Sequence, residues 1–223
     1  MKIADMEVTY VDGCGSDLNV CNAARVSFHK VSEEFTEKDS KLIAYLYKHK
    51  HFSPFNHAFL SFRVKAPIFV ARQLVKHKFM PWNEVSRRYV DEEPEFYFPN
   101  GWRLKADNVK QGSSDVLHKG TSFDYIYWTP EKEVEGCTES ALDTYRALLD
   151  EGICPEQARM VLPQNAMTEW IWSGTLGAFL DMLKLRLDTH TQQETRQVAL
   201  KIAYFVESFF PHSFNAMMES TKQ

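Results

Sequence analysis

The alternation of apolar and polar side chains is clearest over residues 57–65, where it predicts a β-strand. Ala58, Leu60, Phe62 and Val64 occupy every second position, and successive side chains of a strand point to opposite faces. The intervening positions become increasingly basic toward Lys65. A shorter alternation over residues 6–11 predicts a second strand, and the glycine-containing polar segment 12–19 predicts the loop that follows it.

Helical periodicity and capping residues predict most of the remaining elements. Thr36 and Asp39 stand three residues apart, as in a capping box, and predict the start of a helix that runs to about His49. Pro67 suits the first turn of another helix, which continues to about Val75. Apolar residues at helical spacing predict further helices over residues 18–27, 139–150, 155–162, 168–187 and 191–209.

Two of these helices carry apolar stripes that we assign to the core rather than to a ligand pocket. The stripes consist of Leu176, Phe179, Leu180, Leu183 and Leu187 in one helix, and of Val198, Ile202, Phe205 and Phe209 in the other. Residues 91–138 are rich in polar residues, glycine and proline, and a mobile loop is predicted at 106–122. The pattern as a whole predicts one α+β domain over residues 1–223, with a small mixed or antiparallel sheet early and a helical half late.

Composition narrows the functional classes. The 223 residues are 44% hydrophobic and 25% charged, as in an ordinary globular domain. The formal net charge of −4 argues against nucleic-acid binding by the surface as a whole, so any anionic ligand needs a local basic cluster. No stretch approaches the roughly 20 apolar residues of a membrane span. The N-terminus lacks the apolar core of a signal peptide, and a cytoplasmic location is expected.

The four cysteines are scattered through the chain and form no CxxC pair. They are Cys14, Cys21, Cys137 and Cys154. In a chain of this length such spacing supplies neither a disulfide scaffold nor a structural zinc site. Reduced thiols and no bound metal are therefore expected.

Residues 72–89 hold the densest run of side chains suited to binding a ligand. Basic residues cluster around His77 in an otherwise acidic protein, which suits a phosphate or pyrophosphate. Gln73 and Ser86 can add neutral hydrogen bonds, and Glu84 can orient an arginine or accept from a ligand. The same run of charge also fits a solvated basic face with no ligand.

A second group of polar residues lies far along the chain. Arg159 precedes a short apolar run, and Arg186 and His190 stand four residues apart, which places them on one helix face if the helix continues that far. Asp181 lies near the same face. Arginines beside apolar runs are costly to bury unpaired, so they form structural salt bridges or close on an anion.

A series of ordered sequence blocks gives the chain a resemblance to a known family. Lys76-His77-Lys78, seven further residues and Ser86, followed by Arg88-Tyr89, resemble the basic-His-basic signature of the flavin-dependent thymidylate synthases. The flanking blocks occur in the same order as in the family. They are residues 23–27, 51–57 and 65–73 upstream, and Glu95-Phe96-Tyr97, Trp102-Arg103, Lys110-Gln111-Gly112, residues 158–163 and Leu185-Arg186 with His190 downstream.

Several positions depart from the family pattern. Lysines replace the usual arginines of the signature, and a lysine keeps the charge but loses the planar fork of an arginine. Arg87 stands where glycine is common. Asn56, Thr175, Gly177 and Asp181 stand where the family often has glutamate, asparagine, arginine and asparagine, at positions that touch flavin there.

The resemblance implies the α+β fold of the thymidylate synthase-complementing proteins and a role for each matching residue. Deoxyuridylate (dUMP) would be held by Gln73, Lys76, Glu84, Ser86, Arg87, Arg88, Arg159 and Arg186. FAD and the other cofactors would contact Ser27, His51, Ser53, Lys76, His77, Lys78, Phe79, Glu84, Tyr89, Asp181 and His190, with His51 and Tyr89 on the folate and nicotinamide side. Arg186 would stabilise the ionised pyrimidine, and Ser86 would contact the reacting nucleotide. The family assembles as a homotetramer whose subunits share each site.

The implied reaction is the reductive methylation of dUMP to dTMP, with methylenetetrahydrofolate as carbon donor and NADPH as reductant through FAD. No cysteine lies in or beside either group of site residues, which fits a flavin-dependent route without an enzyme nucleophile. Two alternatives stay open. In the first alternative, the same fold acts on another pyrimidine nucleotide such as dCMP, or transfers a hydroxymethyl group in place of a methyl group. Otherwise, the basic surface of residues 63–88 serves a non-catalytic nucleotide-binding or nucleic-acid-binding module.

Overall fold

Strand β3 (Phe59–Pro67) confirms the strand predicted from the alternation over residues 57–65. Ala58, Leu60, Phe62 and Val64 are each at most 1% exposed, so the apolar face is buried as expected. Three more strands complete a sheet of order β2-β3-β10-β4: β2 (Glu7–Cys14), β10 (Met167–Thr175) and β4 (Trp82–Glu84). The predicted N-terminal strand is thus confirmed as β2 and extends into the predicted loop at 12–19.

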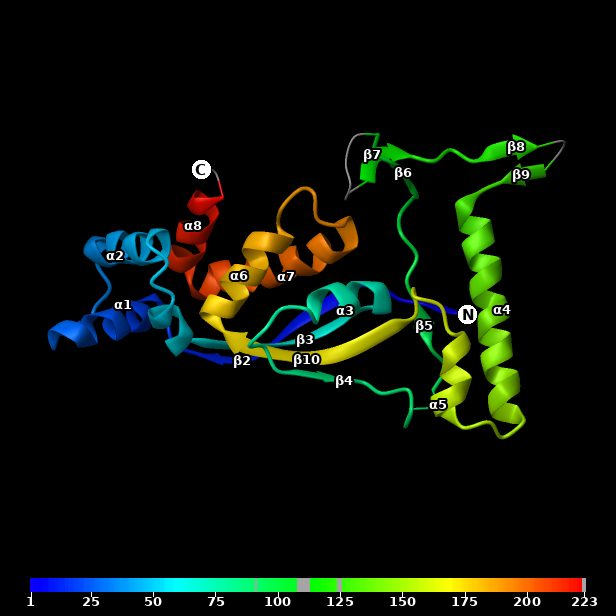
Figure 1. Cartoon of the computed structure of the whole chain (residues 1–223), viewed down its shortest axis with the longest axis horizontal. Helices are drawn as coiled ribbons and strands as arrows, with labels where there is room; N and C mark the ends of the chain where they lie inside the picture. The colour runs from blue at the N-terminus through cyan, green and yellow to red at the C-terminus, as the bar shows by residue number, and fades with distance from the viewer. Residues whose placement is uncertain (91, 108–112, 124–125, 222–223) are drawn as a thin grey trace. The chain divides into compact units, whose positions relative to one another are not determined.

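The computed structural model describes residues 1–90, 92–107, 113–123 and 126–221 (Figure 1). These residues form two compact units. Unit 1 comprises Met1–Met6, Lys65–Gln73 and Glu84–Glu169, and unit 2 comprises Glu7–Val64, Leu74–Asn83 and Trp170–Gln223. Strands β3, β4 and β10 therefore each supply residues to both units.

Unit 2 contains most of the helices. Helix α1 (Asp17–Arg25) begins after Ser16, whose hydroxyl accepts from the backbone N–H of Asn19. Helix α2 (Glu37–Lys48) begins at Thr36 with the predicted capping box to Asp39, and Figure 1 shows it close to α1 and α8 (Pro211–Ser220). Helices α6 (Leu176–Arg186) and α7 (Gln193–Phe209) follow β10.

The aromatic core of unit 2 joins the sheet to these helices. The ring of Phe62 on β3 meets the ring of Phe179 on α6 edge to face, with centroids 5.1 Å apart. Trp172 on β10 contacts Phe179 in the same way at 5.6 Å. These geometries are the favoured ones for aromatic pairs. The two predicted apolar stripes are largely confirmed as core, although Phe209 at the end of α7 is 44% exposed.

Unit 1 is built around one long helix. Helix α4 (Pro130–Asp150) lies beside the short helix α5 (Pro155–Ala158) and the 3-10 turn η3 (Arg159–Val161) (Figure 1). Leu142 and Tyr145 of α4 form a buried cluster with Phe96, Ala158 and Ala166. Short paired strands complete the unit: β1 (Lys2–Ile3) parallel to β5 (Glu95–Phe96), β6 (Arg103–Lys105) antiparallel to β7 (Ser113–Leu117), and β8 (Thr121–Phe123) antiparallel to β9 (Ile126–Trp128).

The helix predicted over residues 168–187 is wrong in its first half, because Met167–Thr175 forms strand β10 before α6 begins at Leu176. Trp170 and Trp172 are buried whereas Ile171 between them is 39% exposed, which is the period of two that a strand produces. The aromatic residues of this segment also favour a strand. Thr175, which caps α6 through the backbone N–H of Ala178, marks the change from strand to helix.

Other boundaries also differ from the prediction. Pro67 ends β3, and α3 (Ile68–Leu74) starts after it. Helix α4 begins at Pro130, nine residues before the predicted start at 139 (139 − 130 = 9), because Thr129 provides the cap. The predicted helix over 155–162 is a single α-turn followed by η3. The predicted loop at 106–122 and the Lys110-Gln111-Gly112 block lie partly or wholly outside the described residues.

The helices within the described part of the chain are all too short or too polar to cross a membrane. All four cysteines are free, as expected.

Candidate functional site

Unit 1 contains a cavity of about 410 Å³ that brings together three of the residues assigned to the nucleotide. Glu84, Arg87 and Arg159 line it, although they come from the end of β4, the loop after it and the start of η3. The backbone N–H of Val85 donates to the carbonyl of Glu169 at 2.8 Å. The hydroxyl of Thr168 donates to Oε1 of Glu84 at 2.7 Å. These bonds fix the acidic side chain at the cavity wall.

The segment after Glu84 presents several donors. The Ser86 hydroxyl accepts from the backbone N–H of Arg88 at 3.4 Å and from its Nε at 3.2 Å. The Arg88 guanidinium also lies 5.0 Å from the ring centroid of Tyr89, and its Nη1 lies 4.0 Å from Glu156. Arg87 donates to the carbonyl of Glu92 at 2.8 Å. Among the described residues the Ser86 hydroxyl contacts an arginine rather than a base, so it is suited to contact a ligand and not to attack one.

Arg159 is exposed at the start of η3. Its Nε donates to the carbonyl of Glu156 at 3.3 Å, and the two Nη groups take no part in this bond. An arginine held at one nitrogen keeps a fork of donors for an anion such as a phosphate. Gln73, at the end of α3, is half-buried in the same unit.

In unit 2, His77 and Arg186 form a direct pair. Nε of Arg186 donates to Nε2 of His77 at 3.0 Å, so this nitrogen of the imidazole is an acceptor and its ring is neutral. Burial and the neighbouring Arg186 cation lower the pKa of His77 to about 4. Burial also lowers the pKa of Arg186. The pair presents a fixed guanidinium, the group that we expected to stabilise an ionised pyrimidine.

The rest of the signature triplet is open to solvent. Lys76 and Lys78 are exposed on either side of His77. Phe79 follows with a left-handed backbone (φ 61°) and a side chain that is 91% exposed. An aromatic ring so exposed in a strained conformation is typical of a surface that meets a flat ligand or another subunit. His190 lies beside Asp188, with Nδ1 2.9 Å from the carboxylate.

Three of the positions that depart from the family pattern contact one another. The hydroxyl of Thr175 donates to Oδ1 of Asn56 at 2.8 Å. A side chain at Gly177 would bring its Cβ within 2.6 Å of the same oxygen. Asn56, Thr175 and Gly177 therefore form one coupled arrangement, in which a larger residue at 177 would displace Asn56. Asp181, the fourth departure, is exposed on α6.

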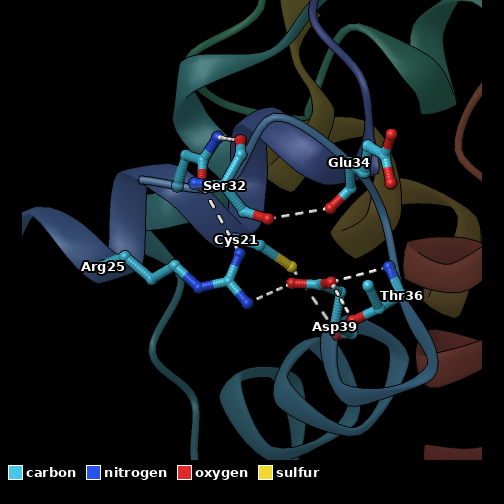
Figure 2. A network of polar contacts seen from close by, with 7 residues as sticks. Cys21, Arg25, Ser32, Glu34, Thr36 and Asp39 are labelled. Carbon is cyan, nitrogen blue, oxygen red and sulfur yellow. Dashed lines mark hydrogen bonds and ion pairs between the residues drawn. The ribbon is translucent and has the colours of Figure 1, made fainter. Parts of the chain in front are cut away.

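A polar network joins Arg25 at the end of α1 to Thr36 and Asp39 at the start of α2 (Figure 2). Arg25, the last residue of α1, forms an ion pair with the fully buried carboxylate of Asp39, which also accepts from the hydroxyl and backbone N–H of Thr36. These bonds lower the pKa of Asp39 against the effect of its burial. Ser27 lies in the 3-10 turn η1 (Val26–Phe28) that follows Arg25 directly. The network thus fixes the chain on which this exposed serine stands.

The structure brings together only part of the predicted site within each unit. Unit 1 holds Gln73, Glu84, Ser86, Arg87, Arg88, Tyr89 and Arg159. Unit 2 holds Ser27, His51, Ser53, Lys76, His77, Lys78, Phe79, Asp181, Arg186 and His190. Thr168 and Glu169 also line the cavity of unit 1 but were not predicted. The period of two over residues 167–175 is the sequence signal that could have placed Thr168 and Glu169 on a strand beside this cavity.

The residues present fit the cofactors that the resemblance implies. Exposed ammonium groups beside an exposed aromatic ring suit a dinucleotide with pyrophosphate and a flat ring system. No cluster of metal-ligating side chains occurs within the described ranges of the chain.

Comparisons with known proteins show the family of the chain. Residues 9–212 match the family model described as thymidylate synthase complementing protein. Proteins named flavin-dependent thymidylate synthase are similar to the chain: one from Thermus thermophilus is 40% identical over 95% of this chain and 75% of its own length. That of Thermosipho melanesiensis is 36% identical over 94% and 89%.

A solved structure is similar over nearly the whole chain. It is the UMP/dUMP methylase PolB from Streptomyces cacaoi bound with 5-Br dUMP, with a TM-score of 0.82, 29% identity, and coverage of 98% of this chain and 97% of that one. The predicted α+β fold is thereby confirmed. With a family model covering most of its length and relatives of 36–40% identity, the chain belongs to the thymidylate synthase complementing protein family, the flavin-dependent thymidylate synthases.

Proposed function

We propose that this protein is a flavin-dependent thymidylate synthase that methylates dUMP to dTMP. FAD would be the flavin, NADPH the reductant and methylenetetrahydrofolate the carbon donor. The observation that carries the proposal is the gathering of Glu84, Arg87 and Arg159 around one cavity of about 410 Å³. Several of the carboxylates that also line this cavity already have partners: Glu84 accepts from Thr168, Glu93 pairs with Arg146 and Glu95 pairs with Lys65. Guanidinium groups beside such carboxylates suit a nucleotide monophosphate, which carries both negative charge and neutral hydrogen-bonding groups.

Each nucleotide-side residue has a role that its geometry supports. Arg87, Arg88 and Arg159 would hold the phosphate. Glu84, fixed by Thr168, would accept from a ligand N–H or hydroxyl, and the hydroxyls and amides of Ser86 and Gln73 would add neutral hydrogen bonds. Arg186, held by His77, would stabilise negative charge on the pyrimidine ring, since a preorganised cation stabilises charge as it develops.

The flavin, when bound, carries reducing equivalents to the nucleotide. Lys76 and Lys78 would hold its pyrophosphate as point charges, His190 would add a hydrogen bond, and Phe79 would cover a flat ring. Ser27 and Ser53 supply exposed hydroxyls, and His51 and Tyr89 would lie on the folate and nicotinamide side. The Thr175 hydroxyl donates to Oδ1 of Asn56, so the N–H groups of the Asn56 amide are what this pair would offer to the flavin.

A homotetramer is part of the proposal. The nearly fully exposed Phe79 supports sites that become complete only on assembly. Obligate interfaces bury exposed aromatic side chains of this kind.

A second substrate is favoured by one comparison. The similar protein of Streptomyces cacaoi is described as a UMP/dUMP methylase, so a ribonucleotide substrate stands beside dUMP as the second candidate. Nothing in the described structure favours dCMP, hydroxymethylation or nucleic-acid binding over these.

The test is a single-turnover assay with dUMP, UMP and dCMP in turn, with the products identified by mass spectrometry. We expect a gain of one methyl group on dUMP. Methylation of UMP alone would replace the proposed substrate with the second candidate, and unmodified nucleotides in every reaction would reject the proposed function.

A further inference from the structure

Unit 2 contains a pocket of about 440 Å³ whose lining residues were not assigned to any ligand above. Its lining residues come from α2 and the turn after it, from α6 and from α8, and α8 contacts both other helices. The lining consists of Ala44, Tyr45, Tyr47, Lys48, Lys50, Phe52, Lys184, Ala216, Glu219 and Ser220. Three ammonium groups thus face one carboxylate in a protein whose net charge is −4.

Two of these lysines are not neutralised. Within the described residues, Lys48 and Lys50 form no ion pair, whereas Lys41 on the same helix pairs with Glu37 at 2.8 Å. Lys184 donates to the Ser220 hydroxyl at 3.1 Å and lies 5.8 Å from the ring centroid of Tyr47. The three cations therefore stay available to an anion.

Lys50 is placed in the pocket by an unusual turn. The N–H of His51 donates to the carbonyl of Leu46 at 2.8 Å, which closes α2 with a six-to-one bond. The residue inside this closure, Lys50, has a φ of 58°. Glycine is preferred at this position because a Cβ is disfavoured in the left-handed region. A lysine in place of the preferred glycine adds an ammonium group at this turn, beside Lys48.

The aromatic residues of the pocket complete a site for a nucleotide. Tyr47 is 3% exposed, and its hydroxyl has no hydrogen-bond partner of ordinary geometry among the described residues. Burial and the nearby Asp181 raise its pKa to about 12, so it remains a donor at neutral pH, although the adjacent Ser220 hydroxyl opposes this shift. Tyr45 is 55% exposed, and the centroids of the His49 and His51 rings lie 4.3 and 6.2 Å from the centroid of its own ring. A base would therefore pack against the outer edge of this group of three rings.

We propose that Lys48, Lys50 and Lys184 bind a phosphate monoester, the 2′-phosphate of NADPH. Three lysines suit a tetrahedral dianion because each ammonium acts as a point charge without the planar demand of arginine. The pocket would then select NADPH over NADH. The identity of this ligand rests on the proposed function, but its binding is measurable without turnover.

The test compares adenosine 2′,5′-bisphosphate with 5′-AMP by calorimetry, on the full chain loaded with FAD. We expect the bisphosphate to bind wild-type protein at least about tenfold more tightly than 5′-AMP. Lys50→Gly should remove most of this preference. It should also leave the thermal midpoint unchanged or higher, because glycine fits the left-handed turn. Lys41→Ala, on the same helix but outside the pocket, is the matched control and should keep wild-type affinity.

Equal binding of the two nucleotides, or wild-type preference in Lys50→Gly, would overturn the proposal. Binding of a tri-γ-glutamate peptide, with no measurable binding of the bisphosphate, would also overturn the proposal. That result would assign the pocket to the carboxylates of a folate tail. Reduction of the flavin by NADPH, followed in the same preparation, separates the two claims. If NADPH reduces the flavin while bisphosphate binding is insensitive to Lys50, the pocket assignment fails and the synthase function stands.

Discussion

At the scale of single residues, the pair of His77 and Arg186 shows how the site prepares a cation. The imidazole accepts at 3.0 Å and so fixes the direction of the guanidinium. The sequence predicted both residues through their family motifs, but it placed His77 with the flavin and Arg186 with the nucleotide. Their contact joins residues 109 positions apart and depends on how α6 packs, which no local pattern of the chain records.

The pH dependence of stability tests this pair. The pKa of His77 is lowered to about 4 from an unfolded value of about 6.5. Between these values the unfolded chain binds the extra proton, so this residue makes the protein less stable as the pH falls from about 6.5 to 4. His77→Gln, whose amide oxygen can accept from Arg186 without titrating, should lose less stability over this window than wild type. Urea unfolding at about pH 7 and about pH 4.5 measures the difference, and parallel losses would refute a neutral, half-buried His77.

At the scale of elements, the network around Asp39 connects the end of α1 to the start of α2. The capping box was predicted from Thr36 and Asp39 and is confirmed, because capping depends on residues three positions apart. The ion pair with Arg25 was not predicted, since it depends on two helices meeting. The strand β10 was missed for a different reason: its apolar residues were matched to a period of about 3.6 when burial follows a period of two.

Removing the buried carboxylate should loosen this helix junction. Asp39→Ala should lower the free energy of unfolding by about 2–4 kcal/mol, because it removes the cap partner and leaves Arg25 without its counter-ion. FAD affinity should fall as well, because Ser27, which we assign to the flavin, lies two residues after Arg25. Urea unfolding and a flavin titration measure the two effects. Lys41→Ala, which breaks only an exposed pair, serves as the control and should change stability by about 0.5 kcal/mol or less. A similar small loss in Asp39→Ala would contradict the account.

The join between β10 and α6 offers a second test at this scale. Gly177→Ala should destabilise the protein by about 1 kcal/mol, because the new Cβ meets Oδ1 of Asn56 and disturbs its bond with Thr175. In Asn56→Ala the same substitution at 177 should be nearly neutral. A double-mutant cycle of unfolding free energies measures this coupling, and additive effects would show that the two positions are independent.

At the scale of the whole molecule, the site residues are divided between two units, although the chain was predicted to form one domain. That prediction stays untested, as does the homotetramer. The family resemblance supplied most of the candidate site residues, and these assignments also stay predictions. Cavity residues such as Thr168 and the lysine pocket at the end of α2 were not predicted, because they depend on tertiary packing.

The most direct test of the central claim is an absorbance spectrum of the purified protein with FAD, recorded before and after adding NADPH and then methylenetetrahydrofolate with dUMP. A flavin-dependent synthase should show a band near ~450 nm that NADPH bleaches and that returns only when both the folate and dUMP are present. A protein that takes up no FAD, or whose reduced flavin is reoxidised anaerobically at the same rate without dUMP, would contradict the proposed function.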